Sequence, residues 1–163
     1  MKIILLFSLF LFVFQADAAL PRSNLMFRCQ TSDTLPDMRY PTKLSLMDLA
    51  AGYYHLVPQD SVGNIQPIFH AYELSGYLTG LTRKSMEENK GFDLKLRDPN
   101  TLKELSFHFI PRGLEASNDA RYPDAKFSSY EVQADSTYCA LTLKDSCKIK
   151  AGQMLTLGTY LCH

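Results

Sequence analysis

The histidines are the residues best suited to chemistry in this chain, and they stand at positions 55, 70, 108 and 163. None has the close spacing of metal ligands, and no His-Glu-x-x-His motif, nucleotide-binding glycine loop or Gly-x-Ser-x-Gly elbow occurs. His108 is predicted to lie opposite Asp93 in a hairpin, where the two side chains would form an oriented acid–base pair. An exposed cross-strand pair has the same geometry, and we favour that interpretation.

Tyrosines and one histidine form the candidate binding set. His70 and Tyr72 share a face of one predicted strand and would line a polar pocket there. Tyrosine offers apolar area with a polar tip, which suits sugars and protein partners, although it also fills β cores. Arg112 belongs to a long polar connection over 111–126, and binding residues concentrate on such loops. The candidate residues are Tyr53, Tyr54, His70, Tyr72, Arg112 and Tyr122.

The cysteines are even in number in a chain that carries an export signal, so disulfides are predicted between Cys29, Cys139, Cys147 and Cys162. Cys139–Cys147 with Cys29–Cys162 is weakly preferred because it closes a small loop and ties the two ends of the chain together. Cys29–Cys139 with Cys147–Cys162, and Cys29–Cys147 with Cys139–Cys162, stay open. The spacings do not match the Cys-x-x-Cys pattern of zinc sites, and we predict neither a metal nor a cofactor.

Residues 1–18 are predicted to be a cleaved signal peptide. Lys2 supplies the positive start, 3–14 the apolar segment, and Ala16-Asp17-Ala18 the small-x-small cleavage pattern. This apolar segment is too short to span a bilayer, which takes about 20 residues. We therefore expect one secreted or periplasmic domain over 19–163, with no membrane span in the mature chain.

The charge balance narrows the choice of partners. Lysine and arginine together number 17, as do aspartate and glutamate, so the net charge is zero. Binding to a phosphate backbone usually requires a basic excess, so a nucleic-acid partner is not expected. We expect a monomer that binds a protein partner, or a small-molecule or carbohydrate ligand.

Alternating hydrophobicity predicts strands in the second half of the chain. The clearest hairpin pairs 92–97 with 104–109 across turn chemistry at 98–101, with Leu96 opposite Leu105. Further strands are predicted at 127–134, 139–144 and 154–162.

The first half has weaker signals. Residues 19–42 are predicted to be an extended leader anchored by Cys29, and 45–52 a short helix that starts at the cap residue Ser45 and stops at Gly52. Strands are predicted at 53–57, 68–74 and 77–82. The helical turn, Gly52, aromatic Tyr54 and following strand resemble the opening of lipocalin-type barrels. Tyr54 replaces that family's usual tryptophan and no second motif follows, so we assign no family.

Together these patterns predict an all-β, mostly antiparallel, disulfide-stapled sandwich or barrel of about seven to nine strands with little helix. Our first functional hypothesis is a non-enzymatic binding module, either protein-recognition or inhibitor-like or small-ligand binding, that acts through loops or one open end of a barrel. The first alternative is a small secreted hydrolase with His108–Asp93 or His70 as its base. The second is a structural or assembly subunit that pairs through an exposed β edge at 154–161.

Overall fold

The computed structural model describes residues 24–33, 37, 39–48, 53–72, 84–116 and 124–163. For Asn24, Asp48, Tyr53 and 70–72 it describes the backbone alone. The predicted signal peptide at 1–18 and the predicted strand at 77–82 lie outside these ranges.

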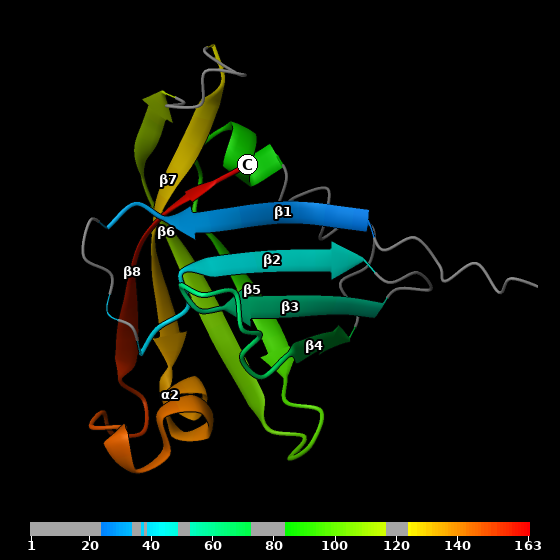
Figure 1. Cartoon of the computed structure of the whole chain (residues 1–163), viewed down its shortest axis with the longest axis vertical. Coiled ribbons are helices and arrows are strands. Elements are labelled where there is room, and N and C mark those ends of the chain that lie inside the picture. The colour runs from blue at the N-terminus through cyan, green and yellow to red at the C-terminus, as the bar shows by residue number, and fades with distance from the viewer. Residues whose placement is uncertain (1–23, 34–36, 38, 49–52, 73–83, 117–123) are drawn as a thin grey trace, which may run out of the picture.

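Eight antiparallel strands close into one up-and-down barrel, in which each strand pairs with its neighbours in sequence and β1 pairs with β8 (Figure 1). The strands are β1 (Asn24–Thr31), β2 (Lys43–Asp48), β3 (Tyr53–Gln59), β4 (Phe69–Tyr72), β5 (Phe92–Arg97), β6 (Glu104–Ala116), β7 (Lys126–Asp135) and β8 (Met154–Cys162). The helix α2 (Ser136–Leu143) and a 3₁₀ turn (Lys144–Ser146) connect β7 to β8, and 84–87 form one helical turn. The predicted all-β class is confirmed, and the architecture is a barrel.

The predicted central hairpin forms in the predicted register. Leu96 pairs with Leu105, and Phe92 pairs with Phe109. The rings of Phe92 and Phe109 stack with their centroids 4.4 Å apart. This register holds because a slip of one residue would turn every charged side chain of the hairpin toward the core.

Aromatic side chains fill the barrel interior, as expected for eight strands, whose interior is just wide enough for side chains. The fully buried rings are Phe27, Phe69, Phe107, Phe109, Tyr130, Tyr138 and Tyr160. Tyr138 of α2 packs 5.0 Å from the ring of Phe107 and closes one end of the barrel. The Tyr160 hydroxyl donates to the Pro41 carbonyl. Burial raises the pKa of Tyr138 and of Tyr160, so both hydroxyls stay neutral.

Two predictions for the first half are wrong. The supposed leader 19–42 contains β1, whose residue Cys29 lies in the sheet opposite Cys162. The supposed helix at 45–52 is replaced over its described part by β2, in which Leu44 and Leu46 both face the core. Pairing with strands on both sides overrides the local cap signal, because each strand buries a full row of apolar side chains.

The predicted strand at 139–144 is also wrong, since this region is α2 and the 3₁₀ turn. Asp135 caps the helix: its Oδ1 accepts from the backbone amides of Thr137 at 2.9 Å and Tyr138 at 3.1 Å. Its Oδ2 accepts from the amide of Ser106 on β6 at 2.7 Å. One carboxylate therefore starts the helix and ties it to the barrel wall.

Replacing Asp135 by alanine is expected to lower the free energy of unfolding by about 2–3 kcal/mol, because the cap is lost and the Ser106 amide loses its partner. Urea denaturation followed by circular dichroism measures the change. Asp145→Ala is the matched control, since Asp145 lies exposed in the next turn. Equal midpoints for the two variants would contradict this role of Asp135.

The predicted long connection at 111–126 is wrong in its first part. β6 passes through a bulge between Pro111 and Gly113 and continues to Ala116, so that Leu114 pairs with Ser128 of β7. Gly113 has a φ of +130°, a conformation that glycine adopts without strain. β6 is therefore longer than its hairpin partner β5 and extends beyond it, paired with β7.

The preferred disulfide pairing is confirmed. Cys29 bonds Cys162 across β1 and β8, and Cys139 bonds Cys147 between α2 and the segment after it. Disulfides are compatible with an extracellular protein. Among the described residues, no helix has the length and apolar character to cross a membrane.

Candidate functional site

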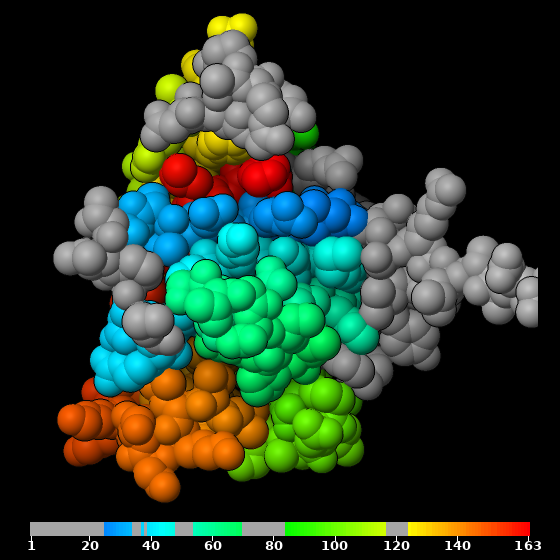
Figure 2. All heavy atoms as spheres, in the orientation of Figure 1, coloured from blue at the N-terminus to red at the C-terminus, as the bar shows by residue number. Residues whose placement is uncertain are grey.

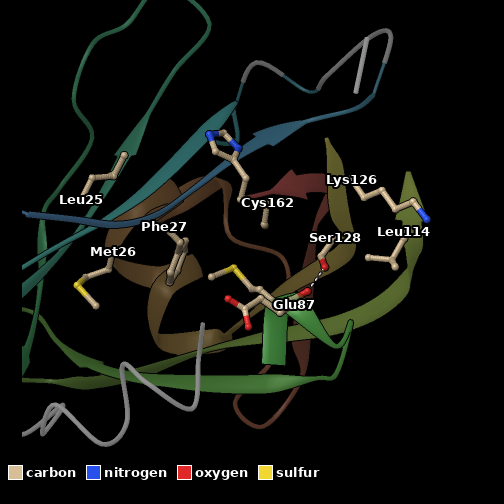
Figure 3. Close-up of a pocket in the computed structure, with 10 residues that line it drawn as sticks. Leu25, Met26, Phe27, Glu87, Leu114, Lys126, Ser128 and Cys162 are labelled. Atoms are coloured by element: carbon tan, nitrogen blue, oxygen red, sulfur yellow. Dashed lines mark hydrogen bonds between the residues drawn. The ribbon is translucent and has the colours of Figure 1, made fainter. Parts of the chain in front are cut away.

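A cavity of about 660 Å³ opens at the end of the barrel opposite α2 (Figure 3). Its wall is mainly apolar, and polar groups are few. The lining residues come from five segments of the chain: Leu25, Met26, Phe27, Met86, Glu87, Leu114, Lys126, Ser128, Cys162 and His163. We call this space the mouth cavity.

Strand register brings one side of the mouth cavity together. Ser128 on β7 pairs with Leu114 on β6 and with Cys162 on β8, so these three residues form a row across adjacent strands. Lys126 lies two residues from Ser128 on the same face of β7. The bulge in β6 is needed for this row, because without it the side chain at 114 would fall on the opposite face.

The segment before β5 forms the floor of the mouth cavity. The Ser128 hydroxyl donates to the carbonyl of Met86, and the Tyr130 hydroxyl donates to the carbonyl of Lys90 at 2.9 Å. The Met86 side chain is buried against the core. Two hydroxyls on the inner face of β7 therefore hold this segment beside the mouth cavity.

The rim of the mouth cavity carries polar groups of different charge. Glu87 is a carboxylate and Lys126 an ammonium group. His163 is fixed by paired backbone hydrogen bonds with Arg28, at 2.9 and 3.0 Å. Partial burial, together with the charge of Arg28, lowers the pKa of His163, so its imidazole is neutral at pH 7. Such a cavity suits a molecule with an apolar body and a polar end.

The predicted binding residues that the structure describes lie on β3, β4 and β6. Tyr54 faces inward and belongs to the core. Tyr53 of β3 pairs with Tyr72 of β4, and His70 lies two residues before Tyr72 on the same strand. The predicted residue Tyr122 lies outside the described ranges.

Arg112 lies on the outer side of the barrel wall rather than in the mouth cavity. Its guanidinium donates to Glu131 Oε2, while Gln133 donates to Glu131 Oε1 at 2.7 Å. The hydrogen bond from Arg112, and secondarily that from Gln133, lowers the pKa of the Glu131 carboxyl. The Arg112 side chain is therefore bound to Glu131 of the neighbouring strand β7.

The predicted pairing of His108 with Asp93 is present. The two residues face each other in the hairpin, with His108 Nδ1 2.7 Å from Asp93 Oδ1. They border a shallow hollow of about 440 Å³ on the outer face, which is lined by Gly91, Phe92, Asp93, His108, Phe109, Ile110, Pro111, Gln133 and Met154. None of these described lining residues carries a hydroxyl or a thiol that the pair could activate.

Within the described ranges, no three side chains of His, Cys, Asp or Glu gather closely enough to hold a metal ion. No pattern in the sequence predicts the mouth cavity. The stretch 83–91 reads as polar and solvated, and only the hydrogen bonds from Ser128 and Tyr130 explain why Met86 is buried.

Comparison with known proteins adds no assignment. No protein-family model, no curated protein and no solved structure matches this chain. Its function has to be inferred from the geometry of the barrel and the mouth cavity.

Proposed function

We propose that this protein is a non-enzymatic binding module that takes one small amphipathic molecule in the mouth cavity. The observation that carries the proposal is a closed barrel with an apolar cavity of about 660 Å³ at one end. Small-molecule sites typically occupy roughly 300–1,000 Å³ and combine apolar walls with a few polar groups. The mouth cavity has both properties.

The walls supply affinity and the rim supplies orientation. Burial of the apolar body against Met26, Phe27 and Leu114 contributes about 25 cal/mol for each Å² removed from water. The polar end of the ligand lies at the rim, beside Lys126 and Glu87. Burying the polar end of the ligand among the aromatic core residues would cost desolvation free energy. At the rim, the polar end keeps its contact with water and avoids this cost.

The two alternatives have weaker support. A hydrolase built on His108 and Asp93 lacks a described nucleophile in the adjacent hollow. An assembly subunit would pair through the edge at 154–161, but β7 covers one edge of this strand and β1 pairs with Tyr160 and Leu161 on the other. We place the binding module outside the cell or in the periplasm, on the predicted signal peptide and the two disulfides.

A fluorescent probe tests the proposal. Anilinonaphthalene sulfonate, which combines an apolar ring system with an anion, is titrated into the oxidised protein. Leu114→Gln is expected to weaken probe binding about fivefold, because the loss of roughly 1 kcal/mol of apolar contact corresponds to that ratio. Leu114 is half exposed, so the barrel should tolerate the change.

The matched control is Ile65→Gln, which removes an equally exposed aliphatic side chain from the loop between β3 and β4. Figure 2 shows the segment after β3 on the surface in front of β2 and β3, and none of its residues lines the mouth cavity. Unchanged probe binding in Leu114→Gln, or an equal loss in Ile65→Gln, would refute the mouth cavity as the site. Native mass spectrometry of the exported protein then identifies any molecule that purifies with it.

A further inference from the structure

The end of the barrel that α2 closes carries a group of exposed lysines. The connection from α2 to β8 contributes Lys144, Lys148 and Lys150, and the turn between β5 and β6 contributes Lys103. The two segments lie side by side at this end (Figure 1), since Lys103 lines the same shallow hollow of about 280 Å³ as Ile149. We call residues 102–103 and 144–151 the closed-end surface.

The positive charge of the closed-end surface is not neutralised by ion pairs. None of the four lysines forms a salt bridge with another residue of the described ranges. Asp98 and Asp135 accept from backbone amides of their own turns, and Glu104 accepts from Arg97 at 2.9 Å. Among the described residues of this surface, four exposed ammonium groups therefore face one exposed carboxylate, that of Asp145, although the whole chain has no net charge.

Two residues of the closed-end surface hold backbone conformations that their side chains disfavour. Leu102 has a φ of +58° and Lys144 a φ of +48°, in a region where a Cβ atom crowds the backbone. The third described residue of this kind, Asn89, belongs to a type that adopts such angles readily. The exceptional conformations within the described ranges are thus gathered at this end of the barrel.

Leu102 is unfavourable at its position for a second reason, because its side chain is 64% exposed. The turn fixes it there: the Leu102 amide donates to the Asp98 carbonyl at 2.8 Å, and the Thr101 amide donates to the Asp98 carboxylate at 2.7 Å. Neither backbone preference nor packing within the barrel accounts for a leucine here. A binding partner that takes its side chain out of water would account for it.

We propose that the closed-end surface docks this protein onto an anionic lipid membrane. Lysines close to an anionic bilayer are attracted by its negative surface potential. An apolar side chain that stands among them enters the boundary between headgroups and acyl chains. Leu102 supplies that side chain, and the half-buried Leu141 and Ile149 of the hollow lie beside the lysines.

The combination of lysines with Leu102 favours lipid over other anionic partners. A sulfated polysaccharide would attract the lysines but would offer Leu102 no apolar surroundings. The apolar groups are small and are separated by lysines, so a fluid bilayer adapts to them more readily than a rigid protein face does. The closed-end surface lies opposite the mouth cavity, so the proposal is independent of the function proposed there.

Flotation with lipid vesicles tests the charge part of the proposal. The oxidised mature protein is mixed with vesicles of two parts phosphatidylcholine to one part phosphatidylglycerol, or of phosphatidylcholine alone. We expect binding to the anionic vesicles alone, and this binding should weaken as salt is added. Lys148→Gln and Lys150→Gln should each weaken it about fivefold, the ratio that corresponds to about 1 kcal/mol for one lysine.

Leu102→Asn tests the apolar part. Asparagine adopts a positive φ readily, so the variant should be at least as stable as the parent in urea denaturation. Its binding to anionic vesicles should nevertheless weaken about fivefold, because the inserted leucine is lost.

The mouth of the barrel supplies matched controls. Lys126→Gln and Leu114→Gln remove an exposed lysine and an exposed leucine from the opposite end, and both variants should bind vesicles as the parent does. Losses in these controls equal to those in the closed-end variants would overturn the proposal, as would unchanged binding in Leu102→Asn or equal binding to both kinds of vesicle. Retention on heparin without binding to anionic vesicles would also overturn it and would assign the surface to a sulfated polysaccharide.

Discussion

Replacing Cys29 and Cys162 together by alanine is expected to lower the free energy of unfolding by about 5 kcal/mol. This disulfide joins residues 133 apart in the sequence, so it removes much conformational freedom from the unfolded chain. Both cysteines are almost completely buried, and the vacated sulfur positions add to the loss. Guanidinium denaturation of the double variant measures the effect and avoids an unpaired thiol.

The second disulfide supplies the matched control. Cys139 and Cys147 are only 8 residues apart, and the same loop-entropy relation gives about 2.5 kcal/mol for their replacement by alanine. The long-range disulfide should therefore matter about twice as much as the local one. A larger loss in Cys139→Ala/Cys147→Ala than in Cys29→Ala/Cys162→Ala would show that the first disulfide does not hold the two ends of the barrel together.

The hairpin of β5 and β6 shows what the sequence alone can predict. Its turn residues at 98–101, its alternating apolar positions and its charge pairs all favour one register, and each signal lies within the hairpin. The structure confirms that register, including His108 opposite Asp93. The pairing of the cysteines followed from counting and from the position of Cys29 near one end of the chain.

Elements that depend on distant partners could not be predicted in this way. At β2 the local sequence resembles a helix cap, and only pairing with β1 and β3 makes Leu44 and Leu46 face one core. At α2 the alternation of Cys139 and Leu141 suits a strand, whereas the cap residue Asp135 and its bond to the Ser106 amide of β6 favour the helix. The pairing at β2 and the bond to Ser106 both join segments that are distant in the sequence, so a local pattern does not contain them.

The candidate sites escaped prediction for the same reason. Met86 lies in a polar stretch, and it is buried because hydroxyls on β7, some 40 residues later, bind its segment. These contacts join segments that are far apart in the sequence, and only the closed barrel brings them together.

Phe107→Ala is expected to lower the free energy of unfolding by about 3–5 kcal/mol, the usual cost of removing a buried ring. Its ring is fully buried, with centroids 6.3 Å from Phe69 and 5.0 Å from Tyr138, so it joins β4 and α2 at the closed end. Truncation leaves a cavity that two aromatic neighbours fill poorly. Phe127→Ala is the control, because Phe127 is only partly buried and should cost much less. Similar losses for the two variants in chemical denaturation would mean that Phe107 does not anchor the end of the barrel that α2 closes.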